Sequence, residues 1–281
     1  MRVGFIGLGS QGGPMARRIL EGGFATTLWA RRKATLEPFA GTTATIAASP
    51  AALAADSDLV CVCVVDDAGV EQVLRGERGD GGVLAGMRPG GIVAIHSTVR
   101  PATCRRLAEH AAARGVALLD APVSGGGVAA SERRLLVMVG GEADVFERVR
   151  LVFATYGDPV LHLGTLGSGQ AAKLLNNLVF TAQLGIATKV FEVGRALDVD
   201  PAALARVLAS GSGRSYGLEL ISNMGFTAAP LAAHAGALLQ KDVGIAAEVA
   251  QASAVDLGAL LAAADAALEV LQHPRGSAEG R

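Results

Sequence analysis

Near its start the chain reads Met1-Arg-Val-Gly-Phe-Ile-Gly7-Leu-Gly9-Ser-Gln-Gly12-Gly-Pro14. Apolar residues 3–6 predict a short strand and residues 14–20 a helix, with Gly-x-Gly-x-x-Gly between them. These glycines permit a tight turn and let the backbone approach a pyrophosphate, while the helix points free N–H groups and its positive dipole end at that anion. This context favours a dinucleotide site over an ordinary loop. The expected contacts are Gly7, Leu8, Gly9, Ser10, Gln11 and Gly12.

The composition limits the partners and the location. With 51% hydrophobic and 18% charged residues, the 281-residue chain can form one large or two ordinary domains. Its net charge of −1 offers no basic face, which argues against nucleic acid as a partner. It has neither a signal-peptide pattern nor an apolar run of about 18 residues, so we expect a cytoplasmic protein without membrane contact.

The few cysteines and histidines predict no metal site. Cys61 and Cys63 alternate within one apolar run and Cys104 stands alone, which is typical of reduced, buried thiols. The five histidines are scattered without ligand spacing. We therefore expect neither a disulfide framework nor a bound metal.

The first part of the chain alternates apolar runs with stretches long enough to be crossover helices. Continuous apolar strands of this kind are typical of a parallel sheet covered on both faces, so the pattern predicts an α/β fold with a doubly wound sheet. The runs are residues 3–6, 26–30, 59–65, 92–95, 117–119, 135–139 and 160–163.

After Gly164 the pattern becomes helical. A helix of unusual length is expected from residue 170 to about residue 197, and further helical stretches follow it, so residues 164–281 are predicted to be all-α. Asp200 and Pro201 predict the N-cap and the first position of a new helix. The tail from His273 is expected to fray.

The second apolar run indicates which dinucleotide binds. It ends Leu28-Trp-Ala-Arg31-Arg32-Lys33, without the acidic residue that takes the ribose 2′-hydroxyl of NAD. Because arginine at this place accepts a 2′-phosphate, Arg31 and Arg32 favour NADP over NAD. The alternative is a solvated basic turn.

Five motifs in this order resemble the β-hydroxyacid dehydrogenases, a family that includes 3-hydroxyisobutyrate dehydrogenase and tartronate semialdehyde reductase. They are Gly7-Leu-Gly-Ser-Gln-Gly-Gly-Pro-Met-Ala16, Ser97-Thr98, Asp120-Ala-Pro-Val-Ser-Gly-Gly126, Gly167-Ser-Gly-Gln-Ala-Ala-Lys-Leu-Leu-Asn-Asn177 and Lys241-Asp242. The resemblance implies a Rossmann domain over residues 1–163 that binds NADP. A long interdomain helix would join it to an all-α domain over residues 164–281, which helps shape the substrate cleft. The resemblance also implies a homodimer or homotetramer, with the all-α part supplying much of the interface.

Lys173 is the expected acid–base residue, because oxidation of an alcohol by hydride transfer needs a group that exchanges the hydroxyl proton. An ordinary lysine pKa near 10.4 is too high for this task, and partial burial or a cationic or dipolar neighbourhood would lower it. Asn177 follows one helical turn later and is expected to align a substrate oxygen or the lysine. The alternative is that both residues belong to the polar face of an amphipathic helix.

The other expected site residues follow strand ends, where ligands of such sheets bind. The Ser124 hydroxyl and the Gly125 and Gly126 amides are expected to hold a substrate carboxylate, although the run also suits a plain Pro-Gly connection. Toward the cofactor we place Val64, Val65, Ser97, Thr98 and Lys241, the last because the family has its lysine there. Lys241 and Asp242 alternatively form an exposed charge pair.

The sequence departs from the family pattern at Gln11, commonly Met, at Ile95, usually Asp, and at Arg133, normally Gly. These changes leave only a substrate class: we expect hydride transfer between NADP(H) and a small 3-hydroxy acid or carboxylated semialdehyde. An imine reductase of the same architecture is an alternative, but such enzymes usually carry Asp or Tyr where Lys173 stands. A non-catalytic dinucleotide-binding module is another, against which Lys173 also argues.

Overall fold

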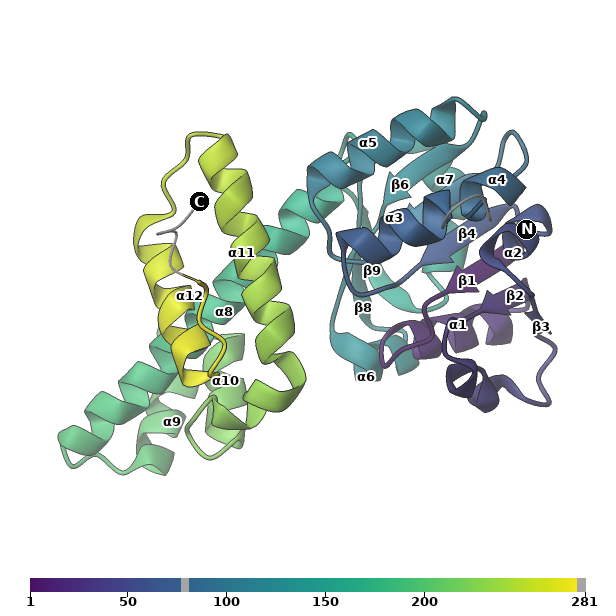
Figure 1. Ribbon diagram of the computed structural model, residues 1–281. Helices are drawn as coiled ribbons and strands as arrows, with labels where there is room; N and C mark the ends of the chain where they lie inside the picture. Colours follow the sequence, from purple (N-terminus) through teal and green to yellow (C-terminus); the bar gives the residue numbers. More distant parts are fainter. Residues whose placement is uncertain (77–80, 277–281) are drawn as a thin grey trace. The chain divides into compact units, whose positions relative to one another are not determined.

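The computed structural model describes residues 1–76 and 81–276 (Figure 1). It divides into two compact units, Met1–Lys173 and Leu174–Arg281. The first unit contains every strand of the described chain, and the second is helical.

The first unit is built on a six-stranded parallel sheet with the strand order β3-β2-β1-β4-β5-β6. The order reverses at β1, which pairs with β2 on one side and with β4 on the other. Such a switch point opens a crevice at the carboxyl ends of the strands. The strands are β1 (Arg2–Ile6), β2 (Ala25–Trp29), β3 (Thr45–Ile46), β4 (Leu59–Val62), β5 (Ile92–Ile95) and β6 (Ala117–Asp120).

Helices cover both faces of this sheet, because successive strand residues point to opposite sides. Phe5 and Cys61 pack with α1 and α7 on one face, whereas Ile6, Val60 and Val62 pack with α2, α3, α4 and α5 on the other. The doubly wound fold class is thus confirmed. The helices of this unit are α1 (Gly12–Glu21), the 3₁₀ helix η1 (Lys33–Phe39), α2 (Pro50–Ala55), α3 (Asp67–Arg75), α4 (Val83–Gly86), α5 (Pro101–Ala112), α6 (Gly126–Ser131) and α7 (Ala143–Phe153).

A second sheet corrects the prediction that all seven apolar runs share one sheet. It contains β7 (Val123–Ser124), β8 (Leu135–Val139) and β9 (Gly157–His162), with β7 antiparallel to β8 and β8 parallel to β9. The chain turns back at the end of β6, and a single bridge between Asp120 and Gly140 links the two sheets. β8 is nearly as buried as the strands of the first sheet, so an apolar run alone cannot tell to which sheet it belongs.

The run predicted at residues 59–65 also ends early as a strand. The strand ends at Val62, although the Cys63 N–H still donates to the Ile6 carbonyl (2.8 Å). The Val64 N–H donates to the Ser97 hydroxyl instead of to a neighbouring strand (2.8 Å). Cys63, Val64 and Val65 are thereby left in the wall of a pocket described below. The apolar character of these residues reflects that wall as well as the sheet core.

The second unit packs its helices around one apolar core that includes Leu178, Phe191 and Leu268. The predicted cap is confirmed: the Asp200 carboxylate accepts from the Ala203 N–H (2.8 Å), with Pro201 in the first turn. The helices are α8 (Ser168–Ala196), which begins in the first unit, α9 (Pro201–Ser210), α10 (Tyr216–Asn223), the short η2 (Ala229–Leu231) and η3 (Ala232–Gly236), α11 (Ala237–Ala252) and α12 (Gly258–Val270).

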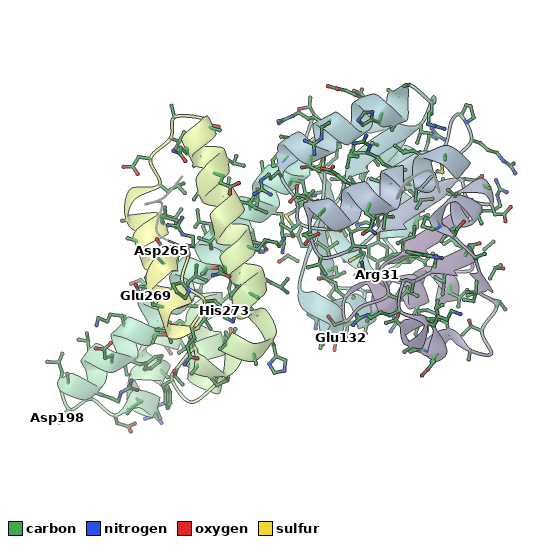
Figure 2. The ribbon with its side chains drawn as sticks, in the orientation of Figure 1. Arg31, Glu132, Asp198, Asp265, Glu269 and His273 are labelled. Carbon is green, nitrogen blue, oxygen red and sulfur yellow. The ribbon has the colours of Figure 1, made fainter. Side chains whose placement is uncertain are left out.

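The predicted fraying of the tail is wrong for its first residues. Arg275 makes two hydrogen bonds, of 2.6 Å each, to the carboxylate of Asp265. Figure 2 labels Asp265 on α12. Gln240 of α11 donates to the Pro274 carbonyl (2.5 Å). Residues 277–281 lie outside the described chain. Within the described residues, no helix combines the length and apolar character needed to cross a membrane.

Candidate functional site

The three glycines of the first motif differ in what surrounds them. A Cβ on Gly7, whose φ is +97°, would lie 2.0 Å from the Cys63 carbonyl oxygen, and one on Gly12 would lie 1.9 Å from the Gly7 carbonyl oxygen. A Cβ on Gly9 would meet nothing within 4 Å. The first and third glycines therefore let the chain pack on itself. The second faces open space, which is the arrangement that lets a pyrophosphate approach the backbone.

The helix that follows this loop offers its first N–H groups to a ligand. No side chain caps α1 at Gln11, and its first turn contains no acidic residue. A helix terminus of this kind favours an anion. The loop and helix fit the phosphates of a dinucleotide.

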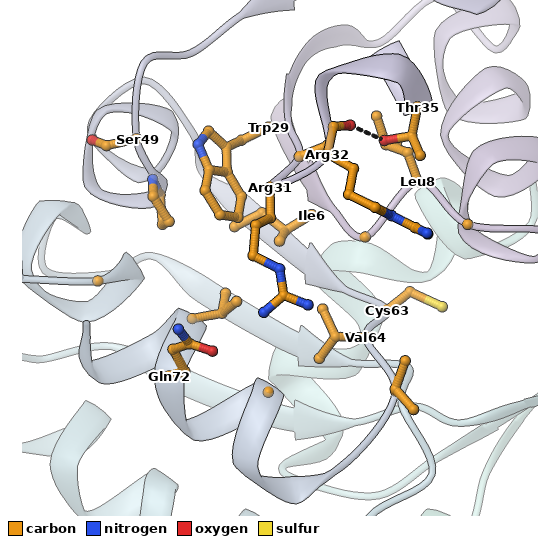
Figure 3. A pocket seen from close by; sticks show the side chains of 18 of the residues that line it. Ile6, Leu8, Trp29, Arg31, Arg32, Thr35, Ser49, Cys63, Val64 and Gln72 are labelled. Atoms are coloured by element: carbon orange, nitrogen blue, oxygen red, sulfur yellow. Dashed lines mark hydrogen bonds between the residues drawn. The ribbon is translucent and has the colours of Figure 1, made fainter. Parts of the chain in front are cut away.

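A pocket of about 990 Å³ opens at the carboxyl ends of β1, β2 and β4 (Figure 3). Arg31 and Arg32 both line it, and Figure 3 shows the Arg31 side chain extending toward Val64 and Gln72. Among the residues that the structure describes, the only lining carboxylate is that of Asp66, which accepts from the Gly69 N–H (2.8 Å) as the cap of α3. Two cations therefore meet any group placed at the end of β2. Among the predicted residues, Gly7, Leu8, Gly9, Arg31, Arg32, Val64 and Val65 line this pocket, whereas Ser10, Gln11 and Gly12 do not.

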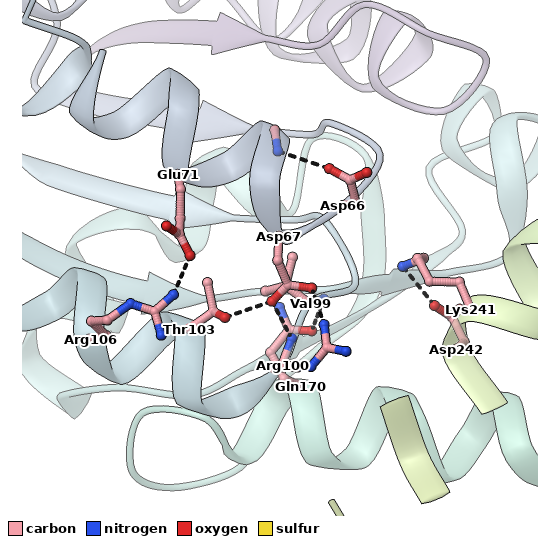
Figure 4. A network of polar contacts seen from close by, with 11 residues as sticks. Asp66, Asp67, Glu71, Val99, Arg100, Thr103, Arg106, Gln170, Lys241 and Asp242 are labelled. Atoms are coloured by element: carbon pink, nitrogen blue, oxygen red, sulfur yellow. Dashed lines mark hydrogen bonds and ion pairs between the residues drawn. The ribbon is translucent and has the colours of Figure 1, made fainter. Parts of the chain in front are cut away.

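The segment that follows β5, residues 96–100, is hydrogen-bonded to the residues that follow β4. Ser97 is buried, and its hydroxyl accepts from the Val64 N–H. Asp67 at the start of α3 accepts from the Thr103 hydroxyl of α5 (2.6 Å) and from the N–H of Arg100, the N-cap of α5 (3.0 Å) (Figure 4). The structure thus gives Ser97 a supporting contact that the sequence did not predict. Thr98 beside it is half-buried.

Two glycines with positive φ form the turn after Ser124. Gly125 has φ +129° and Gly126 has φ +73°, values that side-chain-bearing residues rarely adopt. A Cβ on the next residue, Gly127, would lie 2.3 Å from the Ser10 carbonyl oxygen, so the turn packs directly against the first glycine loop. The structure brings these two predicted parts of the site together.

Asp120 begins the same motif but serves a different purpose. It is fully buried, and its two oxygens accept from the Gly167 N–H (2.6 Å) and the Gln170 N–H (2.7 Å) at the start of α8. Burial raises the pKa of this carboxyl, although the two N–H groups act in the opposite direction. Asp120 thereby fixes the N-terminus of α8 to the end of β6.

Lys173 and Asn177 lie one turn apart on α8 and are both buried, with exposed fractions of 8% and 9%. This argues against a solvated polar face. In the second unit the Asn177 amide donates to Asp242 Oδ2 (2.6 Å), and Lys241 pairs with Asp242 Oδ1 (2.8 Å). Asp242 is only 5% exposed, so Lys241 and Asp242 are not an exposed charge pair.

The thiols and the buried histidine are neutral groups near neutral pH. Burial raises the pKa of Cys63, which lines the pocket, to about 12, and also raises the pKa of Cys61 and Cys104. Burial lowers the pKa of His96 to about 4. In residues 1–76 and 81–276, no group of three His, Cys, Asp or Glu side chains is placed to hold a metal ion.

Two protein-family models cover nearly the whole chain. The NAD-binding domain of 6-phosphogluconate dehydrogenase matches residues 2–164, and the NAD-binding domain of NADP-dependent 3-hydroxyisobutyrate dehydrogenase matches residues 167–280. The chain belongs to the β-hydroxyacid dehydrogenase family. The family, the fold class and the enzyme class predicted from the sequence, an NAD(P)-dependent 3-hydroxyacid dehydrogenase, are confirmed.

Individual relatives agree with this placement. A 3-hydroxyisobutyrate dehydrogenase of Pseudomonas aeruginosa is 34% identical over 274 residues, which cover 92% of this chain and 89% of the relative. A structure of the Mycobacterium tuberculosis 3-hydroxyisobutyrate dehydrogenase with L-serine has a TM-score of 0.84 at 26% identity, covering 96% and 94% of the two chains. A structure of Psf3 in complex with NADP⁺ has a TM-score of 0.77 at 27% identity, covering 88% and 86%.

Sequence reasoning missed residues that contact the predicted site residues of this β-hydroxyacid dehydrogenase or line the pocket. Asp120 and Gln170 lay inside quoted motifs, but nothing local to them indicated their partners. For Asp242 the sequence indicated only that it follows Lys241, and it did not indicate the hydrogen bond from Asn177. Trp29 and Gln72 line the pocket without any motif.

Proposed function

We propose that this chain transfers hydride between NADP(H) and a small 3-hydroxy acid or carboxylated semialdehyde, with Lys173 as the general acid–base. The observation that carries the proposal is the burial of Lys173 in the first two turns of α8. Asp120 binds the N-terminus of this helix to the end of β6. A buried lysine is suited to proton exchange because desolvation disfavours its charged form. The bound nicotinamide supplies or accepts the hydride.

NADP is proposed as the cofactor because of Arg31 and Arg32. Both line the pocket at the end of β2, where the family fold takes the adenosine ribose, and no acidic side chain extends from that strand end. Guanidinium groups bind a 2′-phosphate through charge-assisted hydrogen bonds. The likeness to Psf3, solved with NADP⁺, supports the same choice.

The remaining predicted residues are assigned by position. Gly7 through Gly12, Val64, Val65, Ser97, Thr98 and Lys241 are proposed to contact the cofactor. Ser124, Gly125, Gly126 and Asn177 are proposed to hold the substrate, with the carboxylate at the Ser124 turn. In this proposal, residues 1–163 bind NADP, and residues 164–281 shape the substrate site and form a homodimer or homotetramer.

A panel of substrates tests the proposed function. Short carboxylated semialdehydes, 3-hydroxy acids, the matching non-carboxylated aldehydes and a cyclic imine are assayed with NADP(H) and with NAD(H). We expect turnover of the carboxylated compounds and a preference for NADP(H). Turnover of the imine alone would replace the proposal with an imine reductase, and no turnover of any compound would favour a non-catalytic module.

A further inference from the structure

Gln170 is a buried residue of α8, and the proposed function gives its side-chain amide no role. Its side chain is fully buried and bonds to the residues on either side of Thr98. Gln170 Oε1 accepts from the Val99 N–H (3.1 Å) (Figure 4). Gln170 Nε2 donates to the Ser97 carbonyl (2.8 Å). Because one partner is a backbone donor and the other a backbone acceptor, the amide fits in one orientation only.

The backbone of the same residue is bound to a second strand end. The Gln170 N–H donates to Asp120 Oδ2, while Asp120 Oδ1 takes the Gly167 N–H. The carboxyl ends of β5 and β6 are therefore both tied to this one position of α8. Ser97 continues the connection, since its hydroxyl accepts from the Val64 N–H at the end of β4.

Lys173 follows Gln170 by three residues, about 4.5 Å along the helix axis and close to the same side. All the contacts named above lie within the first unit, Met1–Lys173. We propose that Gln170 is a positioning residue: it fixes where Lys173 lies, along the axis of α8, relative to residues 97–99. This inference rests on the proposed function, in which Lys173 exchanges the proton and Ser97 and Thr98 border the cofactor.

Packing alone does not explain an amide at this place. Methionine has a similar length and would fill the space, but it would remove the partners of the Val99 N–H and the Ser97 carbonyl. Buried backbone groups without partners move until they find new ones. A displacement of about 1 Å at a reacting group costs roughly 10²-fold in rate.

The test compares Gln170→Met in the parent and in Lys173→Ala, with kcat measured at saturating cofactor and substrate. We expect Gln170→Met to lower the parent kcat by roughly 10²-fold. In Lys173→Ala it should lower kcat by no more than about twofold, because residues that act as one unit are not additive. An equal loss in both backgrounds would show general damage and would overturn the positioning role.

Gln183→Met is the matched control on the same helix. Gln183 also uses its side-chain oxygen to accept a backbone N–H, that of Gly217 (3.1 Å), but it lies ten residues beyond Lys173. We expect this variant to keep the parent kcat within about twofold, even where its unfolding midpoint falls. If Gln183→Met lowers kcat as much as Gln170→Met, the effect is not specific to Gln170.

A second variant and a second readout complete the design. Gln170→Glu keeps an acceptor for the Val99 N–H, and in its neutral form the buried carboxyl still donates to the Ser97 carbonyl, so we expect a smaller loss of roughly tenfold. This variant replaces the Met variant if that variant does not fold. Hydrogen exchange at the Val99 amide should be fast in Gln170→Met and slow in the parent. Parental kcat in Gln170→Met overturns only this inference, whereas parental kcat in Lys173→Ala overturns the proposed function.

Discussion

Arg31 and Arg32 make the end of β2 a cationic wall of the pocket, and this wall is where single residues choose the cofactor. Both arginines are exposed, and both line the same cavity. Lys33 is the third cation of the run but begins η1 and does not line the pocket. Lys33 therefore serves as a control for the arginines, because it is a neighbouring cation that does not line the pocket.

Replacing Arg31 with Glu should weaken NADP binding far more than NAD binding. A charge-assisted bond to the 2′-phosphate becomes a repulsion, an exchange worth about 2–4 kcal/mol, whereas NAD has no 2′-phosphate to repel. Titration of both cofactors measures the two affinities. Lys33→Glu makes the same change in net charge and should alter the ratio little. Equal losses for NADP and NAD in Arg31→Glu, or a parent that prefers NAD, would contradict this assignment.

At the scale of elements, His96 links the end of β5 to the end of β6 and to the start of β9. Its Nδ1 lies 2.7 Å from the Ala121 carbonyl, just after β6, and its Nε2 lies 3.2 Å from the Tyr156 hydroxyl, just before β9. The ring stacks on Phe5 of β1 and meets Phe153 of α7 edge-on. Burial among these groups lowers the pKa of His96 to about 4, so the ring stays neutral in the folded protein.

This histidine should make the protein less stable in mild acid. Between about pH 6.5 and pH 4 the unfolded chain binds a proton at His96 and the folded chain does not, so the free energy of unfolding falls by up to about 3 kcal/mol. Asp120 acts in the opposite sense, because its raised pKa lets the folded state bind its proton first as the pH falls. Comparison of the parent with a His96 variant cancels the contribution of Asp120, which both proteins share.

Urea unfolding of the parent and of His96→Gln across this pH range is the measurement. The stability difference should be constant above about pH 7 and then change by roughly 3 kcal/mol in favour of the variant as the pH falls to 4. His110→Gln, at an exposed histidine of α5, serves as the control. Parallel pH profiles for the parent and His96→Gln would show that this imidazole does not set the acid sensitivity.

At the scale of the whole molecule, one face of α8 remains apolar and exposed. The α8 apolar stripe consists of Leu175, Val179, Ile186 and Val193, each more than 40% exposed. Their spacings of four, seven and seven residues place them on one side of the helix. Exposed apolar surface of this kind marks an interaction site. It supports the proposed homodimer or homotetramer.

Ile186→Glu should therefore dissociate the oligomer. A carboxylate in the middle of the stripe would have to be buried without a partner in the assembly, which is costly enough to favour the monomer. Light scattering at micromolar concentration gives the mass of the parent and of the variant. Leu151→Glu, at an exposed position of α7 in the first unit, should keep the parental mass. A monomeric parent, or an unchanged mass in Ile186→Glu, would contradict the assignment of this face.

The sequence predicted best what depends on neighbouring residues. Gly12 reports a close approach to Gly7 within the same motif, and the Asp200 carboxylate caps a helix by binding an N–H three residues away, so local spacing suffices. The strand cores were found for the same reason. The family motifs added Lys173 and Asn177, which the structure buries on one helix.

What the sequence did not predict depends on contacts between distant segments. Asp120 and Gly167 are 47 residues apart, and Ser97 and Gln170 are 73 residues apart. A polar residue inside an apolar strand or helix gives no sign of such a partner. The second sheet was missed because β8 is as apolar as a strand of the first sheet, and its pairing depends on the turn at Gly125 and Gly126.

The central claim, that Lys173 exchanges the substrate proton, is tested most directly by the kcat of Lys173→Ala on the best substrate of the panel. Lys189→Ala is the control on the same helix, because Lys189 is exposed and pairs with Glu192. We expect Lys173→Ala to lower kcat by roughly 10²–10⁴-fold while the NADP dissociation constant changes little, and Lys189→Ala to match the parent. A near-parental kcat in Lys173→Ala would contradict the account.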